Sequence, residues 1–430
     1  MYFGEMEVVK NDKKTIRGWA FFDWANSAYN LVISTAIFPP FFTAMAPEKI
    51  SFMGMDILSS AMYSYSVSFA FLIVAILSPM LSGIADYSGR RMIFLKIFTV
   101  IGAVSCSALY FFDGGDTVWY GLIFFMLGTI GFGAGLVFYN AYLPVIATED
   151  QFDRVSAKGY AYGYFGSVLL LLFILAMMQF PESFGITDTT LGPRIGFILV
   201  GVWWLVFAAV SFRALPPDKN TKMELGFVNK GFLEVKDVFI DVLKNARIKR
   251  FLYSYFFFIA AVNTVIYLAT IFAEVELNFA TSELIIVVLL LQLVASLGAM
   301  FFARVSERIG NKKTLVTQII IWIGICLAAY VTEGKVMFYF VSALVGLVLG
   351  GIQSLSRSTY SKMIKDNVDD LNSYFSFFDV LTRLAIVAGT FLFGIVNQMT
   401  GNIRYSVLSL AVLFIISLLI LWNAKLEEAT

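Results

Sequence analysis

Long apolar stretches, separated by short polar or charged segments, run through the chain from about residue 19 to residue 422. A helix needs about 20 apolar residues to cross a bilayer core about 30 Å thick. The pattern therefore predicts an all-α membrane protein with about twelve membrane-spanning helices. In the first half, the spans are expected at about 19–45, 59–84, 91–111, 117–143, 159–180 and 194–213. In the second half, they are expected at about 250–273, 283–303, 314–332, 337–356, 373–398 and 403–422.

The composition supports a membrane protein and argues against other classes. Hydrophobic residues make up 59% of the 430 residues, charged residues 14%, and the mean hydropathy is +0.80. A soluble domain is about half apolar and about a quarter charged. The net charge of +1 argues against a nucleic-acid partner. The composition indicates the lipid bilayer as a partner, and no obligatory protein partner is evident.

The chain carries little that could serve catalysis. It has no histidine, which removes the usual general base and metal ligand. Its two cysteines, Cys106 and Cys326, lie in apolar runs and predict neither a disulfide framework nor a metal site. No GxxxxGK[ST] phosphate-binding motif occurs. We therefore expect no enzyme activity, no catalytic residue, no metal and no cofactor.

The distribution of lysine and arginine predicts the topology. Most basic residues fall in the N-terminal arm and alternate loops, while the opposite loops carry only Lys49, Arg194, Lys335 and Arg404. The positive-inside rule then places both termini in the cytoplasm. The longest loop divides the chain into residues 1–213, a cytoplasmic linker at 214–249 and residues 250–430.

An amphipathic helix is expected within that linker. Its apolar positions recur at helical spacing, at Phe232, Val235, Phe239 and Val242. Such a helix either lies on the anionic inner leaflet or packs on the protein's own cytoplasmic face.

One loop pattern occurs twice. The segment Gly83–Arg91 and the segment Arg304–Lys312 share an acid, a glycine three residues later and a basic pair just beyond, at an offset of 221 residues. Two parallel repeats of six helices describe the halves of major facilitator transporters. The first copy also resembles that superfamily's loop motif between its second and third spans. The resemblance implies a cytoplasmic gating loop formed by Gly83, Asp86, Gly89, Arg90 and Arg91; simple anchoring of the loop at the membrane surface is the alternative.

Further segments resemble one branch of that superfamily, the autophagy-related vacuolar-effluxer-like permeases. They are Arg17–Tyr29 running into Phe38-Pro39, Phe138–Pro144, Gly159–Tyr164 and Gly350–Ser358. The segment Phe377–Arg383 matches the branch's aromatic and basic pattern but lacks its expected glycines. The resemblance implies the major facilitator fold and a secondary active permease that moves a small polar solute, with amino-acid efflux as the leading expectation. A sugar, drug or organic-anion transporter, or a transport-inactive sensor, is the alternative.

Polar residues inside the expected spans are candidates for contact with solute or protons, because ionisable groups cost about 2.5–3.5 kcal/mol each there. On the first span, Asp23, Asn26, Ser27, Asn30 and Ser34 are spaced to share one helical face. Such a stripe must line a cavity or pack on polar partners. The other candidates for substrate or coupling contact are Asn140, Asn263, Tyr267, Gln353 and Arg357.

Three charged positions leave alternatives open. Asp23 has no basic residue one helical turn away, so it either couples protons or binds an amine, forms a gating salt bridge, or caps a helix end. Asp379 and Arg383 are four residues apart and are expected to form an intramembrane ion pair. Arg357 either holds a substrate carboxylate or extends toward the membrane interface.

The chain has no Asn-x-Ser/Thr sequence, which favours a bacterial cytoplasmic membrane over a glycosylated compartment. The sequence does not identify the solute, the coupling ion, the direction or the oligomeric state.

Overall fold

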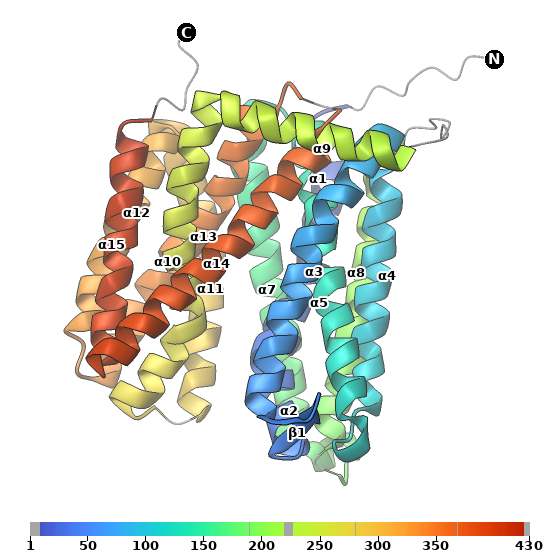
Figure 1. Ribbon diagram of the computed structural model, residues 1–430, viewed down its shortest axis with the longest axis vertical. Helices are drawn as coiled ribbons and strands as arrows, with labels where there is room; N and C mark the ends of the chain where they lie inside the picture. Colours follow the sequence, from blue (N-terminus) through green and yellow to red (C-terminus); the bar gives the residue numbers. More distant parts are fainter. Residues whose placement is uncertain (1–8, 189, 219–226, 280, 368, 425–430) are drawn as a thin grey trace. The chain divides into compact units, whose positions relative to one another are not determined.

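A computed structural model describes residues 9–424 except 189, 219–226, 280 and 368 (Figure 1). The side chains at 60, 61, 64, 227–232, 234, 235, 267, 268, 270, 271, 274, 275, 281, 282 and 398 also lie outside the description. The helices of the first half are α1 (Lys13–Ala28), the π-helix η1 (Tyr29–Ile37), α2 (Phe38–Met45), α3 (Ser59–Ser88), α4 (Arg91–Ala108), α5 (Val118–Asn140), α6 (Leu143–Ile146), α7 (Phe152–Gln179) and α8 (Leu191–Ala214). Those of the second half are α9 (Phe227–Lys244), α10 (Ala246–Leu277), α11 (Thr281–Ile309), α12 (Asn311–Tyr330), α13 (Lys335–Ile364), α14 (Leu371–Thr400) and α15 (Ile403–Trp422).

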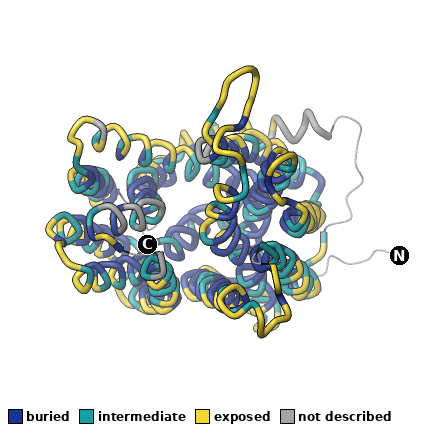
Figure 2. Tube along the Cα trace, turned by 90° about the horizontal axis from the view of Figure 1, so that it is seen from below, coloured by how far each residue is buried: buried dark blue, intermediate teal, exposed yellow. Residues whose placement is uncertain are grey.

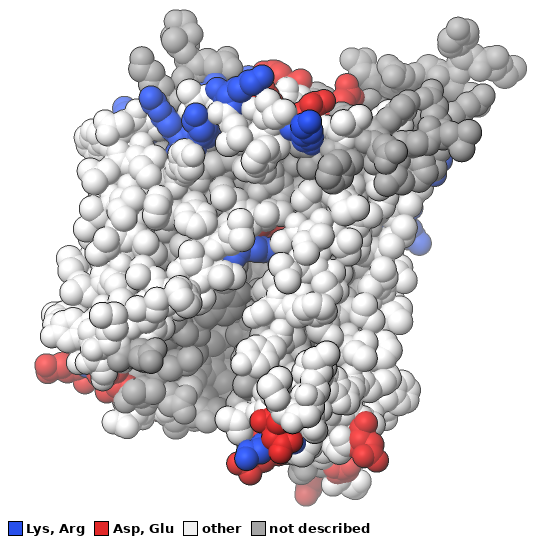
Figure 3. Space-filling model, viewed as in Figure 1, with Lys and Arg blue, Asp and Glu red and all other residues white. Residues whose placement is uncertain are grey.

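The helices confirm the all-α membrane fold. Among the described residues, 11 helical stretches are long and apolar enough to cross a membrane. The twelfth expected span, 250–273, lies within α10, a helix of 32 residues. On the face drawn in Figure 3, charged side chains gather toward the two ends of the helices, and a largely uncharged band lies between them.

One short sheet interrupts the helices. Strands β1 (Lys49–Phe52) and β2 (Met55–Leu58) form an antiparallel hairpin in which Ile50 pairs with Ile57. Its turn residues Met53 and Gly54 both have positive φ, 50° and 79°, as a tight hairpin turn requires. The sequence analysis did not predict this hairpin.

The chain divides into two compact units. Unit 1 comprises residues 1–146 and 162–232, and unit 2 comprises residues 147–161 and 233–430. The division cuts through α7, so the first turns of that helix belong with the second half of the chain. Within each unit, buried residues lie on the inner sides of the packed helices (Figure 2).

In unit 2, the described part of α9 buries the side chains on one face of the helix and exposes those on the adjoining face. Val238 and Val242 are buried, whereas Leu243 is exposed. Phe239 is exposed as well, and its ring centroid lies 5.7 Å from that of Phe377 on α14. Phe232 and Val235, which were expected on the apolar face, have side chains outside the described residues.

Close packing in unit 1 depends on glycine where α4 meets α5. A Cβ atom on Gly131 would lie 2.5 Å from the Cα and N atoms of Gly102 and 2.7 Å from the carbonyl oxygen of Phe98. These are backbone atoms, which cannot move aside as a flexible side chain can. Gly135, one turn later, would place its Cβ no closer than 3.9 Å to a neighbour.

This pair of glycines gives a matched stability test. Gly131→Ala should lower the free energy of unfolding by about 1–3 kcal/mol, because it overpacks a rigid contact. Gly135→Ala should raise it by about 0.5–1 kcal/mol, because alanine favours the helix. Denaturation of both variants in detergent measures the difference, and equal effects would contradict the close approach at Gly131.

Candidate functional site

Asp23 is held inside unit 1 by a tyrosine. It lies on α1, is 5% exposed, and its Oδ2 accepts a hydrogen bond of 2.8 Å from the Tyr139 hydroxyl on α5. The rings of Trp19 and Phe22 stack on Tyr139 with centroids 4.5 and 4.8 Å away. The Trp19 indole N–H also donates to the Tyr139 carbonyl oxygen. The phenol that contacts the carboxylate is therefore fixed from both α1 and α5.

The structure excludes one interpretation of Asp23. The N-cap of α1 is Asp12, whose carboxylate accepts from the Thr15 backbone N–H at 2.8 Å. That hydrogen bond lowers the pKa of Asp12. Asp23 lies in the interior of the helix and does not cap it. Tyr139 was not among the predicted site residues, because its spacing along α5 does not distinguish it from other buried aromatic residues.

Asn26, one turn after Asp23, is 1% exposed, and within the described structure its buried Oδ1 atom has no hydrogen-bond partner. A buried acceptor without a partner costs about 1–3 kcal/mol. Next to it, Ser27 faces α7, where a Cβ atom on Gly163 would lie 2.5 Å from the Ser27 Oγ. The amide oxygen of Asn26 is thus an available acceptor beside a buried carboxylate.

A π-helix interrupts the predicted polar face on the first span. The α-helix gives way to the π-helix η1 at Tyr29, where each residue turns less about the axis than in an α-helix. Asp23 and Asn26 are buried, whereas Asn30 is exposed and Ser34 is half-buried. Exposure therefore changes along the stripe where the π-helix begins, and the spacing argument assumed one continuous α-helix.

The predicted gating loop makes its described contacts within unit 1. Gly89 ends α3 with φ 64°, the left-handed conformation that glycine adopts readily. Gly83 is buried, and Asp86 and Arg90 are partly buried. The Arg91 guanidinium donates to the Ala141 carbonyl oxygen at 3.1 Å.

The same end of unit 1 binds the start of the linker. The Asp218 carboxylate accepts from the backbone N–H groups of Met92 and Ile93, at 2.5 and 3.0 Å, and so satisfies the first turn of α4. Partial burial raises the pKa of Asp218, while these two N–H groups oppose the shift. The Tyr142 hydroxyl donates to the Pro216 carbonyl oxygen.

The second copy of the loop pattern contacts the start of α7 in unit 2. The Arg154 guanidinium donates to both carboxylate oxygens of Glu307, at 2.9 Å each. Asp153, only 3% exposed, accepts from Ser306 at 2.9 Å and from Asn311 at 2.8 Å. It also pairs with Lys362 at 2.9 Å. We call this group of contacts around Asp153 and Arg154 the α7 clasp.

Arg357 on α13 joins the clasp one turn further along α7. Its Nε and Nη2 atoms donate to the Ser156 hydroxyl and carbonyl oxygens, at 2.9 and 2.7 Å. Its guanidinium lies 4.3 Å from the centre of the Tyr160 ring. Arg357 is 3% exposed, so its side chain is enclosed by other groups of the protein.

The other predicted residues are spread over unit 2. Arg383 and Asp379, one turn apart on α14, form a bidentate salt bridge. The Arg383 Nε and Nη2 atoms donate to the Asp379 Oδ2 and Oδ1 atoms at 2.7 and 3.2 Å. The Asn263 amide donates to the Ile259 carbonyl oxygen of its own helix. Gln353 is half-buried one turn before Arg357. The side chain of Tyr267 lies outside the described residues.

Asn140 is half-buried next to Tyr139 in unit 1. Of the predicted residues, the structure thus brings Asp23 and Asn26 together on α1, and Gln353 and Arg357 together on α13. Within the described part of the chain, no three Asp, Glu or Cys side chains are grouped so that they could hold a metal ion.

Known proteins that are similar in sequence to this chain are named as transporters or belong to an effluxer family. A protein-family model described as vacuole effluxer Atg22 like matches residues 11–430. The uncharacterized MFS-type transporter YxiO of Bacillus subtilis is 30% identical over 425 residues, which cover 98% of this chain and 97% of that protein. Autophagy-related protein 22 of Kluyveromyces lactis is 25% identical over 408 residues, 87% of this chain and 81% of that protein.

Two solved structures share the fold. The human organic anion transporter MFSD10 matches with a TM-score of 0.69 and 12% identity, over 96% of this chain and 100% of that chain. The Escherichia coli fucose:proton symporter FucP matches with a TM-score of 0.67 and 15% identity, over 96% and 98%. At these identities the likeness concerns the fold alone.

Proposed function

The chain belongs to the Atg22-like vacuole effluxer family of the major facilitator superfamily, and from that premise we propose that it exports amino acids by proton-coupled alternating access. It is an MFS-type transporter and not an enzyme. Efflux follows the name of the family. The solute class and the proton are argued from the polar groups of unit 1.

The observation that carries the proposal is the buried pair of acceptors on α1. Asp23 supplies a carboxylate next to the Tyr139 hydroxyl, and Asn26 supplies an amide oxygen without a partner among the described residues. A carboxylate and a carbonyl oxygen suit an ammonium group, which has only N–H donors. An amino acid carries that group, whereas a sugar or a simple organic anion does not. The same Asp23 carboxylate would bind and release the coupled proton during the transport cycle.

The α7 clasp supports the alternating-access part of the proposal. In a rocking transporter, one end of the path must be held shut while the other end is open. The first turns of α7 are held by charged and polar groups of α11, α12 and α13 through Glu307, Asn311 and Lys362. We expect these contacts to break when the cytoplasmic side opens.

A transport assay with matched solutes tests the proposal. Protein in liposomes, with an imposed pH gradient, should accumulate labelled alanine but not lactate, in which a hydroxyl replaces the amine. Fucose serves as the sugar control. Accumulation of lactate or fucose without alanine would overturn the assignment of the solute. Flux of alanine that ignores the pH gradient would remove the proton from the mechanism.

A further inference from the structure

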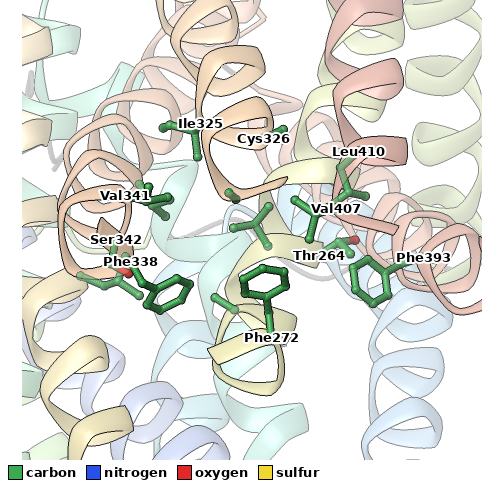
Figure 4. Close-up of a pocket in the computed structure, with 15 residues that line it drawn as sticks. Thr264, Phe272, Ile325, Cys326, Phe338, Val341, Ser342, Phe393, Val407 and Leu410 are labelled. Carbon is green, nitrogen blue, oxygen red and sulfur yellow. The ribbon is translucent and has the colours of Figure 1, made fainter. Parts of the chain in front are cut away.

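An apolar pocket of about 50 Å³ lies among the six helices α10–α15 of unit 2, away from Arg357 and the clasp. Phe272, Ile325, Cys326, Val341, Phe393 and Leu410 are among its lining residues. Figure 4 shows the Phe272 and Phe338 rings at one end of the pocket and the side chains of Ile325 and Cys326 at the other.

A network of charged groups covers the end formed by the two rings. Phe272 and Phe338 stack with centroids 6.0 Å apart. The Arg404 guanidinium lies 5.7 Å from the centre of the Phe272 ring and pairs with Glu276 at 2.8 Å. Arg404 also donates to the Tyr330 carbonyl oxygen. These groups connect α10, α12 and α15 at this end of the pocket.

Tight contacts between helices close the other end. Trp322, one turn before Cys326, stacks on Phe414 of α15 with centroids 5.4 Å apart. Along the side of the pocket, near Phe393, a Cβ atom on Gly389 would lie 2.4 Å from the Thr264 hydroxyl, so α10 and α14 are in close contact there. These contacts border the pocket along the axis of the helices, although it is not fully enclosed.

The lining determines what the pocket can hold. A buried water needs two to four polar partners, but the Thr264 hydroxyl already donates to the Ala260 carbonyl oxygen at 2.7 Å. The remaining polar side chains are Ser342 and Cys326. The pocket is large enough to hold water, so its apolar lining, and not its size, decides what it binds. We infer that the pocket is a binding site for a small, uncharged, apolar molecule of a few heavy atoms.

The two cysteines of the chain provide the test. Cys326 lines the pocket, whereas Cys106 is fully buried in unit 1 with its thiol 3.4 Å from the Phe197 carbonyl oxygen. In intact protein in lipid nanodiscs, N-ethylmaleimide should modify Cys326 about tenfold faster than Cys106, because Cys326 lines the pocket whereas Cys106 is fully buried. Xenon under pressure, a guest of dry apolar cavities, should slow the reaction of Cys326 alone.

Two variants sharpen this result. Ala329→Leu fills the pocket and should abolish the effect of xenon. Arg404→Ala opens the charged cover and should speed the modification of Cys326. Arg194→Ala is its control, because Arg194 is an arginine of unit 1 that likewise donates to a backbone carbonyl oxygen, that of Tyr110. Equal rates at the two cysteines, or no effect of xenon on Cys326 in the unaltered protein, would overturn the inference. Neither result depends on which solute is transported.

Discussion

Asp23→Asn should reduce pH-driven accumulation of solute about a hundredfold, the scale of a lost proton-transfer group, while exchange between preloaded solutes continues. Asparagine keeps the size of aspartate, and its amide oxygen can still accept a hydrogen bond from the Tyr139 hydroxyl. It cannot bind and release a proton as a carboxylate does. Exchange needs no net movement of protons, so it should survive. Uptake into liposomes, with and without an imposed pH gradient, measures both quantities.

Asp12→Asn is the matched control for that experiment. It makes the same chemical change on the same helix, but at the N-cap, outside the membrane-spanning part. Accumulation should stay close to that of the unaltered protein. If Asp23→Asn left accumulation intact, Asp23 would have a packing or gating role only, and another group would have to couple the proton.

Asp153→Ala should release the start of α7. Breaking a buried ion pair by removing one partner costs about 3–5 kcal/mol. The Asp153 side chain is 4% exposed but Lys362 is 24% exposed, which reduces the cost to about 2 kcal/mol. At about 1.4 kcal/mol per factor of ten, the clasped form should lose roughly thirtyfold in population. A cysteine placed at buried Ser156, in a variant lacking Cys106 and Cys326, would report this as faster reaction with a membrane-impermeant maleimide.

The neighbouring arginine provides the comparison. The Arg154 side chain is 65% exposed in its pair with Glu307, and an exposed salt bridge contributes about 0–1 kcal/mol. Arg154→Ala should therefore change the labelling rate much less than Asp153→Ala. Similar effects of the two substitutions, or no effect of either, would show that the buried carboxylate does not hold α7.

Much of the fold follows from properties of short segments. The number and approximate ends of the spans follow from the free energy of transferring apolar side chains into lipid, which is summed along one helix at a time. The ion pair of Asp379 and Arg383 follows from their four-residue spacing, because such residues are neighbours on any α-helix. The turn at Gly89 follows from the conformational freedom of glycine.

Other features required contacts between distant segments. The first span changes from an α-helix to a π-helix at Tyr29, which alters the angular spacing of its later residues, and no periodicity in the sequence marked where the change begins. The two copies of the loop pattern have similar sequences. In the first copy, Arg91 donates a hydrogen bond to the Ala141 carbonyl oxygen of unit 1, whereas in the second copy Glu307 accepts one from Arg154 at the start of α7. Only the surroundings of each copy distinguish them.

The sequence by itself determined that this protein lies in a membrane, that its helices form two related halves and that few polar residues lie within the spans. Only the tertiary structure decided which of those groups meet: Asp23 with Tyr139, 116 residues away, and Arg357 with Ser156, 201 residues away. The physical reason is that burial and helical spacing are local properties. The partner of a buried charge depends instead on which helices pack together, and that packing depends on the whole chain.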